Sequence, residues 1–174
     1  MNKLGHDNLP SLHVACTSDN PKVLLLLLDC GAKLSTDDGT FPDDLENIKL
    51  SEECNAIVKQ AKQKRLNELL KIAKENQTVP NLRVGDLKLR NSDGTSLLMM
   101  PEVLANTVFM KEACRVIMEK FQDSAKRRYV IVNARRPSDG STALIEASKF
   151  GKVDCIRRLI KVGADPALAD KTDW

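Results

Sequence analysis

The strongest constraint on the fold is a spacing that occurs twice in the chain. Leu12 precedes Gly31 by 19 residues, and Leu144 precedes Gly163 by the same number. Around both pairs the pattern predicts a short helix, a turn and a second apolar helix that ends at glycine. A new turn begins at Asp170, 33 residues after Pro137. A period of this length indicates small helical units that stack and bury one another's faces.

Residues 137–169 show the local signals of such a unit most clearly. Gly140 suits the positive φ of a tight turn, Thr142 is placed to cap the first helix, and Gly151 is placed to end it. Apolar residues at intervals of three and four predict the buried stripe of the second helix, formed by Val153, Ile156, Leu159 and Ile160.

The segment from Pro137 to Gly151, closed by Gly163-Ala164-Asp165, resembles an ankyrin repeat. Pro10-Ser11-Leu12-His13-Val14-Ala15-Cys16 is similar to the Thr-Pro-Leu-His-x-Ala-Ala start of such a repeat, although Asp19 stands where Gly151 stands. The sequence matches the ankyrin repeat pattern most completely over residues 137–174, less completely over 5–45 and least completely over 91–121. The resemblance implies an all-α fold, an ankyrin-repeat solenoid of helix–turn–helix–hairpin units with two irregular insertions.

The resemblance also suggests an organisation for the chain. We expect N-terminal ankyrin-like repeats over 1–75, the second of them degenerate, with a long helix that starts at Ser51. We expect an insertion or linker over 76–90. C-terminal repeats should fill 91–174, with an insertion at 122–132 and a truncated last repeat. Because the sequence stops inside a hairpin, we expect it to be a piece of a longer protein.

Three places depart from the repeat pattern. Leu82–Leu89 alternates around Gly85-Asp86, which predicts a small hairpin. Tyr129–Val132 follows three basic residues and is β-branched, which suits a strand packed on the array, or else an edge that pairs with a partner. Pro101 falls within an expected helix, so that helix should be shifted or kinked.

Several classes of function receive no support from the sequence. The five cysteines lack Cys-x-x-Cys spacing, which argues against a disulfide framework or a zinc site; we interpret Cys16, Cys30 and Cys155 as small core residues of an intracellular protein, cytoplasmic or nuclear. By the ankyrin resemblance His13 is structural. No phosphate-binding glycine loop or nucleophile motif occurs. We therefore expect that the protein is not an enzyme and that it has no catalytic residue, bound metal, cofactor or small-molecule substrate. The apolar run Leu24–Leu28 is too short to span a membrane.

Charge is unevenly distributed along the chain. Residues 120–174 carry 12 Lys or Arg and 7 Asp or Glu, whereas residues 1–119 carry 15 and 17. The basic end favours an acidic or phosphorylated segment of a protein partner. Nucleic acid is a poor fit, because aromatic residues are scarce and acidic residues gather near the second unit, at Asp37, Asp38, Asp43, Asp44 and Glu46.

The resemblance therefore implies a protein–protein interaction scaffold that holds a partner segment in its concave groove and at its hairpin tips. The alternative is a substrate-positioning module of a multidomain enzyme, such as a ubiquitin ligase or a kinase. Phe150 precedes the glycine between the helices, where it either forms an apolar contact for the partner or covers a neighbouring repeat. The candidate partner-binding residues are Arg135, Arg136, Ser138, Asp139, Ser141, Lys149 and Phe150, with Ser92, Asp93 and Thr95 one unit earlier.

Overall fold

A computed structural model of the chain describes residues 11–36, 39–44, 49–75, 77–79 and 81–171. In these ranges every regular element is a helix, and the strand-like pairing is confined to one isolated bridge between Arg90 and Ser96. Contacts divide the chain into two compact units, residues 1–64 and 65–174, and the division falls within one long helix.

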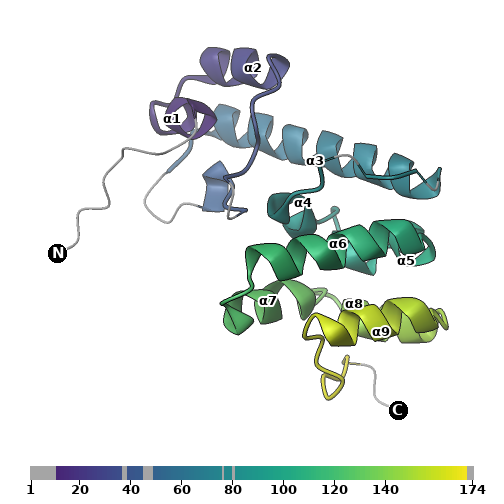
Figure 1. Ribbon diagram of the computed structural model, residues 1–174. Coiled ribbons are helices and arrows are strands. Elements are labelled where there is room, and N and C mark those ends of the chain that lie inside the picture. Colours follow the sequence, from purple (N-terminus) through teal and green to yellow (C-terminus); the bar gives the residue numbers. More distant parts are fainter. Residues whose placement is uncertain (1–10, 37–38, 45–48, 76, 80, 172–174) are drawn as a thin grey trace. The chain divides into compact units, whose positions relative to one another are not determined.

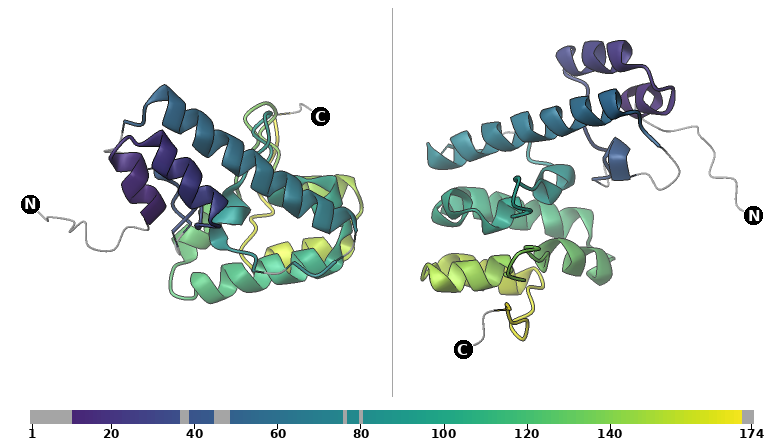
Figure 2. Two further views of the ribbon diagram at one scale, coloured as in Figure 1. Left: turned by 90° about the horizontal axis from the view of Figure 1, so that it is seen from above. Right: turned by 180° about the vertical axis from the view of Figure 1, so that it is seen from behind.

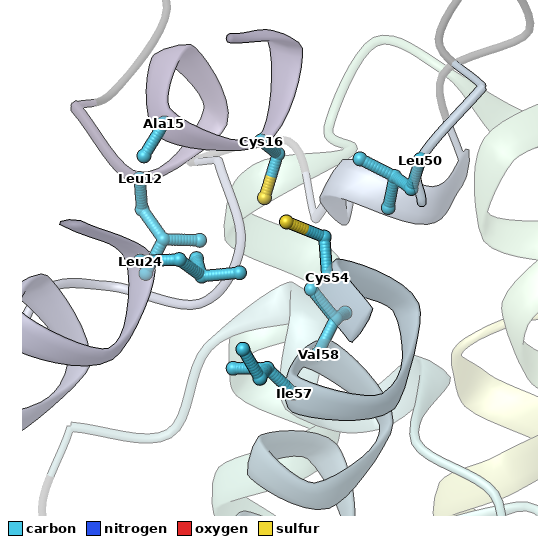
Figure 3. Close-up of a cluster of buried hydrophobic side chains, with 8 residues drawn as sticks. All are labelled: Leu12, Ala15, Cys16, Leu24, Leu50, Cys54, Ile57 and Val58. Carbon is cyan, nitrogen blue, oxygen red and sulfur yellow. The ribbon is translucent and has the colours of Figure 1, made fainter. Parts of the chain in front are cut away.

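The first unit contains α1 (Ser11–Thr17), α2 (Pro21–Asp29), the 3₁₀ turn η1 (Pro42–Asp44) and the first half of α3 (Glu52–Lys74) (Figure 1). Figure 3 shows the start of α3 facing α1 and α2, with the sulfur atoms of Cys16 and Cys54 directed toward one another. The buried cluster that holds this unit together is apolar throughout and consists of Leu12, Ala15, Cys16, Leu24, Leu50, Cys54, Ile57 and Val58.

Capping side chains fix the helix starts of the first unit. The Asn20 side chain accepts a hydrogen bond from the Val23 N–H, and Pro21 occupies the first turn of α2. The Ser51 hydroxyl accepts from the Cys54 N–H at the start of α3, as the sequence predicts. Asp19 connects α1 and α2 with a φ of +46°, the left-handed conformation that Gly151 adopts between α8 and α9.

The second unit contains the rest of α3 followed by short and longer helices in a stack (Figures 1 and 2). Helix α6 packs on α9, α8 packs on α9, and the 3₁₀ turn η2 packs on α8. The elements after α3 are α4 (Val84–Lys88), η2 (Leu97–Met99), α5 (Pro101–Ala105), α6 (Thr107–Lys120), α7 (Ala125–Val132), α8 (Ala143–Lys149) and α9 (Val153–Lys161).

Buried polar bonds join successive layers of the second unit. The Asn106 side chain caps α6 through the Phe109 N–H and donates to the Ala73 carbonyl of α3. The Cys155 thiol of α9 donates to the Leu104 carbonyl of α5. Because an unpaired polar group in the core is destabilising, these bonds restrict how one layer can shift against the next.

Two of the predicted local structures are wrong. The expected hairpin at 82–89 is helix α4, because Asp86 accepts from the Arg83 N–H and forms a two-bond ion pair with Arg65 at 3.0 and 2.9 Å. The expected strand at 129–132 is the end of α7, so pairing through a strand edge is also excluded there. The prediction for Pro101 is confirmed, since η2 ends before it and α5 begins at it.

The predicted burial is wrong at three positions. Cys30 is exposed, although Cys16 and Cys155 are buried as expected. On α9 the buried side chains are Cys155 and Leu159, whereas Val153 and Ile160 are exposed. Val153 and Ile160 are exposed because the face of α9 that packs against α8 and α6 contains Cys155 and Leu159 instead.

Some sequence expectations lie outside the described residues. These include Asp37, Asp38 and Glu46 of the acidic stretch, and residues 172–174 at the end of the expected last repeat. The boundaries that the sequence predicts between the repeats and the insertion, after residues 75 and 90, stay a prediction.

Candidate interaction surface

Three hairpin tips share one backbone geometry. In each, a residue before the turn donates its N–H to a carbonyl four or five residues later, at 2.9 to 3.1 Å: Thr36 to Thr40, Asn91 to Thr95, and Arg136 to Ser141. A glycine with φ between +73° and +82° makes each turn possible, at positions 39, 94 and 140. In the first unit the buried His13 ring donates from Nε2 to the Thr40 carbonyl, which confirms its structural interpretation.

The two tips of the second unit are in direct contact. A Cβ atom added at Gly94 would lie 2.6 Å from Cδ of Pro137, the next tip along the chain. Arg90 donates from Nη1 both to the Gly94 carbonyl of its own tip and to the Arg135 carbonyl of the next. Arg135 repeats this arrangement, since its Nη1 donates to the carbonyls of Gly140 and Ala169. Arginine side chains thus hold consecutive tips at a fixed separation.

A buried carboxylate joins the last full tip to α8. Oε1 of Glu146 accepts from the Ser141 hydroxyl at 2.7 Å and forms an ion pair with Arg136 at 2.6 Å. Lys149 reaches the same oxygen at 3.5 Å and forms a second ion pair with Asp170 at 3.0 Å. The hydrogen bond with Asp170, followed by the charge of Glu146, raises the pKa of Lys149. The charges of this cluster are therefore largely satisfied within the protein.

The candidate residues differ in what they offer to a partner. Ser138, Ser92 and Asp93 are exposed at the tips, while Asp139 and Thr95 are half-buried. Phe150 is 49% exposed at the end of α8. Ser141 is fully buried beneath Glu146, so its predicted contact with a partner is wrong.

Eight of the ten candidate residues fall into three groups. Arg136, Asp139, Ser141 and Lys149 are linked through Glu146, which sequence reasoning missed because a glutamate within a helix usually lies in solvent. Phe150 is seven residues from the start of α8, about 10 Å along its axis. Ser92, Asp93 and Thr95 belong to the preceding tip, where the Asn91 side chain accepts from the N–H groups of Asp93 and Thr95.

Reactive chemistry finds little support in the described part of the chain. No group of three or more His, Cys, Asp or Glu side chains there is arranged to hold a metal ion. Burial raises the pKa of the Cys114 thiol to about 11, and burial also raises that of Cys54 and Cys155. These thiols therefore stay protonated at neutral pH and are poor nucleophiles. None of the described helices is both long enough and apolar enough to span a bilayer.

Comparison with known proteins finds one recognisable repeat near each end of the chain. Ankyrin repeat family models match residues 139–171 and residues 7–36. No curated protein and no solved structure is significantly similar to the chain. Ankyrin repeats are in general protein–protein interaction modules and are typically non-catalytic. The chain therefore carries ankyrin repeats at residues 7–36 and 139–171, and the helical elements of its described residues fit an all-α ankyrin-type solenoid.

Proposed function

We propose that the protein binds an extended segment of a partner protein along the hairpin tips and α8 of the second unit, with Phe150 as the main apolar contact. The observation that carries the proposal is the half-exposed phenyl ring of Phe150 at the end of α8. The charged side chains of this helix are already paired within the protein. Exposed aromatic side chains flanked by polar groups are typical centres of protein interfaces.

The tips would contribute contacts of another kind. Ser138, Ser92 and Asp93 present hydroxyl and carboxylate groups to solvent on two tips that touch one another through Gly94 and Pro137. Because these tips are held rigidly, a bound segment would lose little energy to reorganising the protein. The Arg135 side chain is exposed as well, and its cation suits an acidic or phosphorylated residue in the partner.

The proposal assigns the protein a non-catalytic role in recognition. Its support is the ankyrin family's general use in protein binding, together with an exposed surface that the internal ion pairs leave available. The five cysteines, all free thiols, agree with a reducing compartment, so we extend the proposal to an intracellular site of action.

The test is binding by purified protein rather than capture alone. Partners recovered from a cell lysate would be expressed singly, and their affinities measured by calorimetry for the wild type and for Phe150→Ala. We expect Phe150→Ala to weaken the authentic complex about tenfold or more, as for an interface hot spot. Arg136→Ala is unsuitable for this purpose, because it removes a partner of buried Glu146 and disturbs the fold.

Val108→Ala is the matched control. Val108 is about as exposed as Phe150, but it lies near the start of α6 rather than at the end of α8. Partners that lose affinity for Phe150→Ala and not for Val108→Ala would support the proposed surface. Equal affinity of every partner for wild type and Phe150→Ala would show that recognition occurs elsewhere.

A further inference from the structure

Helix α7 is the part of the second unit that the repeat pattern does not explain. It follows α6, within the segment expected to be an insertion, and lies outside both family matches. The Ser124 side chain caps its start through the Arg127 N–H, and Ile131 and Val132 bury its end. Figure 2 shows α7 as a separate short helix within the second unit.

Hydrogen bonds on both sides hold α7 in place. Toward α6, the Arg128 guanidinium donates to the carbonyls of Phe121 and Gln122. Toward the loop after α9, Asn133 donates to the Gly163 carbonyl and accepts from the Asp165 N–H, and the Tyr129 hydroxyl donates to the Asp165 carboxylate. The helix is therefore a positioned element of the stack, and its orientation is fixed.

The outward side of α7 combines apolar and basic groups. Val130 is 65% exposed, more than any other large apolar side chain in the described residues, and Tyr129 beside it is 46% exposed. Lys126 and Arg127 are exposed one turn earlier. Neither cation forms an ion pair with any described residue, whereas Arg136 and Lys149 near the last hairpin tip are paired with Glu146 and Asp170.

We propose that α7 is a docking surface for an acidic segment of another protein that carries an aliphatic or aromatic side chain. Lys126 and Arg127 would meet its carboxylates, and Val130 with the ring of Tyr129 would cover its apolar residue. The charge of the region supports this choice, since residues 120–174 carry five more basic than acidic side chains. This surface does not depend on the proposed function of Phe150 and the hairpin tips.

An acidic peptide fits the surface better than a membrane does. Helix α7 has eight residues, and its side directed to solvent has two large apolar side chains. Membrane-surface helices instead present a long continuous apolar face. The tyrosine hydroxyl is also held by Asp165, which keeps the ring in the stack rather than free to insert.

The experiment uses the full chain and a phage-displayed library of random peptides as the probe. Selected peptides are synthesised with a fluorophore, and their affinities are measured by anisotropy for the wild type, for Lys126→Glu/Arg127→Glu and for Val130→Asp. Lys59→Glu/Lys64→Glu is the control, because it makes the same change of charge at exposed positions of α3. Thermal unfolding followed by circular dichroism verifies that all variants stay folded.

We expect the selected peptides to be rich in Asp and Glu around one apolar residue. Both α7 variants should weaken their binding about tenfold or more, while the α3 control and Phe150→Ala should bind as the wild type does. Peptides without acidic residues would overturn the proposal, as would equal affinity for the α7 variants, dependence on Phe150, or no selected peptide at all. Binding to phosphatidylserine vesicles that depends on α7, without peptide binding, would also overturn it.

Discussion

The repeats at the two ends of the chain have the same spacing but solve the turn between their helices differently. In the later repeat the turn is Gly151, with a φ of +62° and open space where a side chain would be. In the earlier repeat it is Asp19, with a φ of +46°. Hydrogen bonding to the side chains of Ser51 and then Cys54, at the start of α3, lowers the pKa of the Asp19 carboxylate. The strained backbone conformation of Asp19 thus occurs where the side chain of the same residue links the turn to the start of α3.

The same comparison separates the helices that precede these turns. Leu12 and Ala15 of α1 correspond to Leu144 and Ala147 of α8, and all four are buried. Between them, Val14 is exposed, whereas the corresponding Glu146 is buried and paired with Arg136. The earlier repeat is stabilised by an apolar cluster and by the hydrogen bond from His13 to the Thr40 carbonyl, whereas in the later repeat a buried ion pair joins helix and hairpin.

The largest predicted effect tests the apolar contribution in both repeats. Leu24→Ala and Leu159→Ala each remove a fully buried side chain and should lower the free energy of unfolding by about 4 kcal/mol. Urea unfolding followed by circular dichroism measures the loss. Hydrogen exchange should place the loss from Leu24→Ala in α1 and α2, and that from Leu159→Ala in α8 and α9. Faster exchange spread evenly over both units would show that the two units do not unfold separately.

The second prediction tests the ion pair between Glu146 and Arg136, which joins helix and hairpin in the later repeat. Glu146→Ala leaves Arg136 without the carboxylate that it pairs with, and it should destabilise the protein by about 3 kcal/mol. This value is at the lower end of the range for breaking a buried ion pair, because Arg136 is partly exposed. Val14→Ala, at the corresponding exposed position, should change stability by less than about 0.5 kcal/mol. Similar unfolding midpoints for both variants would contradict the contrast.

The third prediction concerns the turn itself. Gly151→Ala forces a side chain into a left-handed conformation without any clash, so it should destabilise by about 1–2 kcal/mol. Asp19→Gly relieves that strain but removes the hydrogen bonds to Ser51 and Cys54, so its net effect should be smaller. A marked gain in stability from Asp19→Gly in urea unfolding would show that the carboxylate contributes nothing.

The smallest predicted effect is a dependence on pH. The hydrogen bonds with Ser51 and then Cys54 lower the pKa of Asp19 below its ordinary value of 3.8. Asp19 therefore stabilises the folded state fully above pH 3.8, and this contribution is lost as the pH falls through the lower folded value. The stability difference between wild type and Asp19→Asn should shrink as the pH falls from 6 toward about 2.5. A difference that stays constant over this range would contradict the assignment.

Signals confined to a few neighbouring residues could be predicted from the sequence. Thr142 caps α8 through the Ile145 N–H, and Ser51 caps α3, because a cap depends on residues three positions away. Long-range partners explain the failures. Helix α4 depends on Asp86, whose ion pair with Arg65 joins positions 21 residues apart. The β-branched residues of α7 become helical because burial of Ile131 and Val132 outweighs their strand propensity.

The candidate surface was predictable to a similar extent. The sequence placed Ser138, Ser92 and Asp93 at exposed tips, because the turn glycines can be recognised from residues close by. It could not reveal that Ser141 lies beneath Glu146, since that contact requires the hairpin to fold back on α8. Whether any of these residues binds a partner stays a prediction.

The contact between Gly94 and Pro137 has a consequence for how such a surface can be redesigned. These two residues leave no room for a larger side chain at Gly94, whereas Ser92, Asp93 and Ser138 around them are exposed. A combinatorial library that keeps Gly94 and Pro137 and randomises the three exposed neighbours should therefore yield mostly folded proteins. The tips could then be directed to new targets without altering the repeats that hold them.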